Sequence, residues 1–150
     1  MTTTAGDTIW FDNMLMEVLL PASDTGGTIS ILEQTHVRGY GTPVHRHDRE
    51  DQTVYVLAGA ITAWLDDDER TVRAGELIHL PRGRAHAFRV DEDGTRLLEI
   101  NTPGGFEEFH AEAGEPAAGR RLPDPRPPDL ATMVAIASTY DCEILGPPPT

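Results

Sequence analysis

Two stretches of the sequence decide the fold: residues 39–59, GYGTPVHRHDREDQTVYVLAG, and residues 75–88, GELIHLPRGRAHAF. The first carries His45 and His47 between two glycines, and the second carries His86 after a proline and a glycine. On an extended strand the side chains alternate between the two faces, so His45 and His47 point to the same side. Two adjacent imidazoles and a third from a later strand make a facial ligand set for a transition metal. The sequence therefore predicts a metal site made of these three histidines.

The other three histidines lie outside these glycine- and proline-containing patterns. His36, His79 and His110 are expected to be surface residues or satisfied core residues rather than ligands. His79 is out of phase with the apolar Ile78 and Leu80, so we expect its ring on the outer face of a strand.

Length and charge limit the class of protein. The chain has 150 residues, with 25 acidic against 12 basic residues and a formal net charge of −13. The length suits a single domain over residues 1–150 with a core of its own. The negative charge argues against nucleic acid and anionic membrane surfaces as partners, because both are bound through cationic patches. The single cysteine, Cys142, and the lack of a signal-peptide or membrane-spanning pattern lead us to expect a cytoplasmic protein.

Residues 8–102 contain short apolar segments separated by Gly- and Asp-rich turns. Strands at this spacing predict an all-β sandwich or barrel. We expect Thr53–Leu57 and Ala60–Leu65 to form a hairpin around Gly59, since they flank this glycine on both sides.

Residues 103–150 differ in composition and are expected to form a helical and proline-rich extension. One candidate helix covers Phe106–Ala113, and a second begins after the capping residue Asp129 and runs to about Ser138. The second helix has an apolar stripe that we expect to cover the barrel or a dimer seam, made of Leu130, Met133, Val134 and Ala137.

These features together resemble the cupin family, and within it the bacterial quercetin 2,3-dioxygenases. Beyond the two stretches, the resemblance includes Thr102-Pro103-Gly104-Gly105-Phe106-Glu107 and Glu143-Ile144-Leu145-Gly146-Pro147-Pro148. It implies one cupin domain, a double-stranded β-helix or jelly-roll barrel with its core at about residues 8–102 and short C-terminal helices. It also implies one divalent transition metal as cofactor, for which histidine nitrogen allows Fe, Ni, Mn, Co, Cu or Zn.

One site position departs from the family pattern. Where most cupins carry a glutamate ligand, this chain has Gln52, which offers a neutral carbonyl and an amide donor but neither charge nor base. We therefore expect Gln52 to be a weak ligand or none. A catalytic base would have to come from elsewhere, and the adjacent Asp51 points to the opposite face of a regular strand. Glu99 is either a carboxylate inside the barrel with a raised pKa or an outer residue in a salt bridge. Gln52 and Glu99 are the candidate catalytic residues.

Three functions remain open at this point. The first, implied by the resemblance, is a metal-dependent dioxygenase acting on a small aromatic or enolic molecule, flavonol- or polyketide-like. The second is a redox-neutral cyclase, isomerase or dehydratase of secondary metabolism that uses the metal as a Lewis acid, which the lost acidic ligand favours. The third is a non-catalytic cupin that binds a small molecule. We expect a homodimer in each case, because the segment Trp10–Leu20 and the helix 129–138 carry more apolar residues than a small barrel needs.

Overall fold

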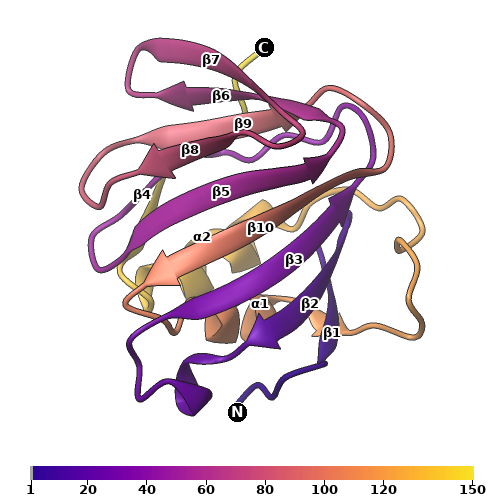
Figure 1. Ribbon diagram of the computed structural model, residues 1–150, viewed down its shortest axis with the longest axis vertical. Coiled ribbons are helices and arrows are strands. Elements are labelled where there is room, and N and C mark those ends of the chain that lie inside the picture. The colour runs from indigo at the N-terminus through magenta and orange to yellow at the C-terminus, as the bar shows by residue number, and fades with distance from the viewer. Residues whose placement is uncertain (1) are drawn as a thin grey trace.

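The computed structural model describes residues 2–150, and its strands form two antiparallel sheets (Figure 1). In spatial order, the seven-stranded sheet contains β11 (Glu115–Pro116), β1 (Thr8–Phe11), β2 (Met14–Leu20), β3 (Ser30–His36), β10 (Thr95–Thr102), β5 (Asp51–Ala58) and β8 (Leu77–Leu80). The five-stranded sheet contains β12 (Cys142–Gly146), β4 (Val44–His47), β9 (His86–Val90), β6 (Ala60–Leu65) and β7 (Asp68–Arg73). The predicted all-β jelly-roll class is confirmed.

Gly59 separates the two sheets instead of closing a hairpin. β5 pairs with β10 and β8 in the larger sheet, whereas β6 pairs with β9 and β7 in the smaller one. The predicted hairpin between Thr53–Leu57 and Ala60–Leu65 is therefore wrong. Gly59 has a φ of 81°, and a Cβ on it would overlap Thr95, so the chain passes close to the start of β10 as it changes sheets. The hairpin of this region joins β6 to β7 around Asp66, whose φ is 51°.

The two α-helices in residues 2–150 lie behind the larger sheet in the view of Figure 1, and both were predicted. α1 (Glu107–Ala113) contacts β1 and α2 (Leu130–Ser138), and α2 packs on β12. The carboxylate of Asp129 accepts a hydrogen bond from the Thr132 N–H at 3.1 Å, which is the expected helix cap. β12 pairs with β4, so the end of the chain returns to the sheet that carries His45 and His47. Among the described residues, no helix is long and apolar enough to cross a membrane.

The inner face of β3 is partly polar. Its buried residues alternate with partly exposed ones, and they are Ser30, Leu32, Gln34 and His36. His36 is fully buried, with its Nε2 2.9 Å from the Gln34 carbonyl oxygen and its ring stacked on Tyr40 at 4.8 Å between centroids. Burial lowers the pKa of His36 from 6.5 to about 3, and the opposing charge of Glu99 only partly offsets this. His36 is therefore a neutral core residue at physiological pH.

The neutral state of His36 predicts how stability depends on pH. Because its folded pKa lies below the unfolded value, its contribution is complete above pH 6.5 and is lost as the pH falls toward 3. Each bound proton that the unfolded chain gains is worth about 1.4 kcal/mol per pH unit in that window. We expect His36→Gln to flatten the pH dependence of the free energy of unfolding between pH 6.5 and 4, measured by urea denaturation. His79→Gln, on the exposed face of β8, is the control and should leave the slope unchanged. A wild-type slope in the His36 variant would contradict the prediction.

Candidate metal centre

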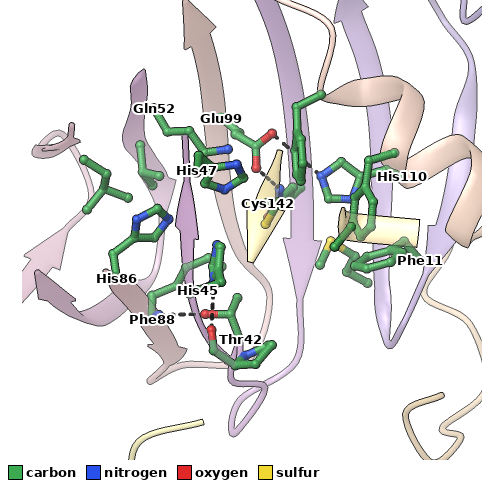
Figure 2. Close-up of a pocket in the computed structure, with 18 of the residues that line it drawn as sticks. Phe11, Thr42, His45, His47, Gln52, His86, Phe88, Glu99, His110 and Cys142 are labelled. Carbon is green, nitrogen blue, oxygen red and sulfur yellow. Dashed lines mark hydrogen bonds and ion pairs between the residues drawn. The ribbon is translucent and has the colours of Figure 1, made fainter. Parts of the chain in front are cut away.

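Strand pairing brings three imidazoles together. His45 and His47 lie on β4, and His86, the first residue of β9, is the register partner of His45. The centroids of the three rings are 4.4 to 5.4 Å apart, and one nitrogen from each ring lies within 4.8 Å of the others. In Figure 2 the three rings stand together at one side of the pocket. The arrangement predicted from strand parity is thus present in the structure.

Hydrogen bonds orient two of these rings. His45 Nδ1 lies 2.7 Å from the Pro43 carbonyl oxygen, and His47 Nδ1 lies 2.6 Å from a carboxylate oxygen of Glu50. Because these partners are acceptors, Nδ1 carries the proton in the neutral form of each ring, and Nε2 then has the lone pair. His47 Nε2 is buried and has no hydrogen-bond partner among the described residues. A buried imidazole nitrogen without a hydrogen-bond partner fits the role of a metal ligand.

The charge states of two of the three rings also suit metal binding. Burial lowers the pKa of His45 to about 4, and the charge of His47 adds to the effect. The pKa of His86 falls well below its usual value because of burial and the neighbouring His45. Burial also disfavours the charged form of His47, but contacts with Cys142 and Glu50 outweigh it and raise its pKa to about 9. Two neutral imidazoles and a third backed by a carboxylate are a donor set that fits a divalent transition metal.

The triad forms part of the wall of an apolar cavity with about 70 Å³ of free volume. Most of the remaining wall is apolar, and it includes the aromatic rings of Phe11, Tyr40, Phe88, Phe106 and Phe109. Met133 and Ala137 of α2 also line it, so half of the predicted helix stripe faces the cavity, while Leu130 and Val134 are 49% and 44% exposed. A second hollow of about 260 Å³ shares Phe11 and Met133 with the first.

Gln52 lies on the cavity wall and is tied to a polar network. Its Nε2 donates to Asn101 Oδ1 at 2.9 Å, and Asn101 Nδ2 donates to a carboxylate oxygen of Glu99 at 3.0 Å. An ionised Glu99 only accepts hydrogen bonds, so Asn101 must turn its amide nitrogen toward Glu99 and its oxygen toward Gln52. The amide nitrogen of Gln52 therefore faces Asn101, and its carbonyl oxygen is the group that can face the pocket. Whether Gln52 is a ligand stays a prediction.

Glu99 projects into the barrel and is only 8% exposed, which decides between the two predicted locations. Gln34 Nε2 donates to its other carboxylate oxygen at 3.1 Å. Burial by itself raises the pKa of Glu99, but the nearby His110 and the hydrogen bond from Asn101 outweigh it, so the pKa is lowered. The prediction of a raised pKa is therefore wrong, because the buried carboxylate is surrounded by donors. Its role in catalysis remains a prediction.

Two outward-facing predictions are confirmed. Asp51 accepts hydrogen bonds from the Arg82 backbone and guanidinium at 2.8 and 3.2 Å, on the face opposite Gln52. His79 is exposed, and its Nδ1 lies 3.0 Å from the Thr53 hydroxyl. Neither residue lines the cavity of the triad.

Sequence reasoning missed His110. It lies on α1, is 5% exposed and lines the same cavity as the three histidines, with its Nε2 3.8 Å from Glu99 (Figure 2). Because His110 lies in neither of the two histidine-containing stretches, it was expected to be an ordinary core or surface residue. A usable signal was its helical spacing with Phe106 and Phe109, because that spacing puts all three on the buried face of the helix.

The fold and the site together define a class of protein. Residues 32–101 match the family model described as the cupin domain. The chain carries a cupin domain.

Its relatives include enzymes. The chain is 24% identical over 143 residues to a quercetin 2,3-dioxygenase of Bacillus subtilis, covering 95% of this chain and 42% of that protein. It is 30% identical over 63 residues to the pectin degradation protein KdgF of Dickeya dadantii, covering 42% of this chain and 56% of the relative. Among solved structures, KdgF from Halomonas sp. is similar with a TM-score of 0.59 at 19% identity, covering 64% of this chain and 84% of that one. The chain thus spans only part of the length of either curated relative, and the structural likeness concerns the fold.

The contact between His47 and Glu50 predicts a measurable effect on metal affinity. Both side chains are almost fully buried, so the Glu50 charge acts on His47 with little screening by water. We expect Glu50→Gln to weaken binding of Co²⁺ or Ni²⁺ by about 10- to 100-fold, as removal of such a supporting carboxylate does elsewhere. Calorimetric titration measures this. Asp48→Asn is the control, since Asp48 is exposed and pairs with Arg46. Absence of binding by the wild type would contradict the metal centre, and equal affinities would remove Glu50 from it.

Proposed function

We propose that this protein is a metal-dependent enzyme acting on a small enolic or aromatic molecule, with dioxygenase chemistry like that of the quercetin 2,3-dioxygenases it resembles. The observation that carries this proposal is that three imidazoles lie on the wall of a cavity whose other lining residues are mostly apolar. Metal ligands beside an apolar chamber suit a planar substrate whose oxygen atoms reach the ligands while its carbon skeleton lies on the aromatic wall.

The residues of the chain have distinct roles in this proposal. His45, His47 and His86 would hold one divalent ion (Fe, Ni, Mn, Co, Cu or Zn), which supplies Lewis acidity and, if redox-active, a path for electrons to oxygen. The apolar wall excludes water, and this strengthens every electrostatic interaction inside the cavity. Gln52 contributes a carbonyl oxygen or a hydrogen bond without adding charge.

The dimensions of the cavity bear on the substrate. A free volume of about 70 Å³ is less than the roughly 150 Å³ of an apolar cavity known to hold benzene. A compact enolic molecule therefore needs only a small adjustment of the wall, whereas a three-ring flavonol needs the second hollow as well. Phe11 and Met133 stand between the two spaces, and the unbranched side chain of Met133 repacks with little strain. We propose a compact hydroxy-ketone or a related enol as the preferred substrate.

One observation favours the redox-neutral alternative, a cyclase, isomerase or dehydratase. The amide of Gln52 is held by Asn101, which is in turn held by Glu99, so the neutral group at this position belongs to an ordered network. A neutral side chain leaves the metal with more of its positive charge, and this suits polarisation of a substrate carbonyl. The third alternative, a non-catalytic binder, predicts binding without turnover in any metal.

Replacement of Gln52 separates these functions. If the protein is a dioxygenase, Gln52→Glu should tighten metal binding and raise oxygen-dependent cleavage of flavonols, because a positioned base is worth about 10²- to 10⁴-fold in rate. If the reaction is redox-neutral, the same change should lower turnover, because it weakens the Lewis acid. The measurement is oxygen uptake together with substrate loss for flavonols and compact hydroxy-ketones, after loading with Fe, Ni, Mn or Co.

The control for that experiment is Thr53→Glu, which adds the same charge on the outer face of the same strand, next to His79. It should leave both oxygen uptake and metal binding at the wild-type level. Substrate loss without oxygen uptake would overturn the dioxygenase proposal in favour of the redox-neutral reaction. No substrate loss in any metal for either protein would favour the binder.

We also propose that the protein is a homodimer in the cytoplasm. The exposed Leu130 and Val134 of α2, and Leu145 on the neighbouring β12, offer an apolar surface of the kind that a two-fold partner covers. The single, buried cysteine is compatible with a reducing compartment. We expect light scattering at micromolar concentration to give twice the chain mass, and Val134→Glu to shift it toward the monomer. A monomer mass for the wild type would contradict the dimer.

A further inference from the structure

His110 is a buried imidazole in an aromatic cage. Its ring packs edge-on against Phe11, Phe106 and Phe109, with centroids 4.8, 5.1 and 5.1 Å away. These phenylalanines line the cavity of the three-histidine triad, and so does His110 itself. The ring is therefore fixed in orientation by packing, and it lies in a space from which water is largely excluded.

Neither nitrogen of this ring has a hydrogen-bond partner within residues 2–150. A carboxylate oxygen of Glu99 lies 3.8 Å from Nε2, which is too far for a hydrogen bond. A buried polar group without a partner costs about 1–3 kcal/mol. A protein that keeps such a group at the wall of a cavity has a use for it when the cavity is filled.

The other histidines outside the triad differ from His110 in this respect. In His36 only Nδ1 lacks a partner, since Nε2 is hydrogen-bonded to Gln34, and the ring does not line the cavity. His79 is on the outer face with Thr53 as its partner. His110 is thus the imidazole outside the triad that combines burial, unpaired nitrogens and access to the cavity in the described part of the chain.

We infer that His110 is a catalytic residue that takes the proton from a substrate hydroxyl group, with Glu99 stabilising the imidazolium that forms. This inference rests on the proposed function, in which the substrate is an enol or a phenol. Gln52 has no basic group, so the proton cannot go to the position where cupins usually carry a carboxylate. The structure places a base on the opposite wall instead, on α1.

We infer the following proton transfer. The Glu99 carboxylate favours the tautomer with the proton on Nε2, which leaves the lone pair on Nδ1. The substrate O–H bond breaks, its electron pair stays on the oxygen as an enolate or phenolate, and the proton forms a bond to Nδ1. The imidazolium then faces the negative Glu99, while the substrate anion faces the triad on the other wall (Figure 2). The proton returns to the product before release, so His110 ends in its starting state.

A spectroscopic experiment tests this without turnover. The probe is maltol, a compact hydroxy-ketone whose enolate absorbs at longer wavelength than its neutral form, and the protein is loaded with Zn²⁺ so that no oxidation occurs. We expect bound maltol to be the enolate at neutral pH in the wild type. In His110→Gln, the pH at which bound maltol ionises should rise by roughly one to three units. Glu99→Gln should raise it by less, and His79→Gln should leave it unchanged.

A second measurement reports the tautomer and the protonation state of His110. Ring nitrogen NMR of the zinc-loaded protein should find His110 as the Nε2–H tautomer before maltol is added and as the imidazolium afterwards. Equal ionisation of bound maltol in wild type and His110→Gln, with unchanged His110 nitrogens, would overturn the inference and leave the proposed function standing. Failure of maltol to bind the wild type at all would overturn the proposed substrate class, and the inference with it.

Discussion

The carboxylate of Glu99, buried inside a β-barrel, determines how the polar side chains around it are oriented. A buried charge is tolerated only when donors surround it, and Gln34 and Asn101 supply them from β3 and β10. Each amide that turns its nitrogen toward Glu99 must turn its oxygen away. The oxygen of Gln34 then meets His36, and the oxygen of Asn101 meets Gln52. One carboxylate thus orients polar side chains on three neighbouring strands of the larger sheet.

The same carboxylate divides the cavity into two regions. On one side stands the three-histidine triad, with His45 and His86 neutral and His47 backed by the Glu50 carboxylate. On the other side His110 stands among phenylalanines. Glu99 lies between these regions in Figure 2. Because the walls are apolar, charges inside the cavity interact more strongly than they would in water, so small changes in protonation have large effects on what binds.

Gln52 adds no charge near the triad, but the barrel interior contains the carboxylate of Glu99. Asn101 links this carboxylate to Gln52 by two hydrogen bonds. A metal at the triad keeps more of its positive charge, while the barrel interior still contains an anion that can stabilise a cation elsewhere. The cupin fold accommodates this because its chemistry resides in a few inward-facing positions of the strands rather than in the architecture.

What the sequence alone determined were the features that follow from local periodicity. Strand alternation predicted that His45 and His47 share a face, that Asp51 points away from Gln52, and that His79 faces outward. The helix cap at Asp129 was predicted for the same reason, since a cap depends on residues three positions apart.

Only the tertiary structure decided the rest. The sheet change at Gly59 depends on its contact with Thr95, a residue distant in sequence, and local turn chemistry alone predicted a hairpin. The lowered pKa of Glu99 results from the nearby His110 on α1 and the hydrogen bond from Asn101 on β10, which no local pattern reveals. His110 comes to the cavity because α1 packs against β1, far from the histidine motifs in sequence. Periodicity determines the direction in which a side chain points, whereas its partners and its charge depend on long-range packing.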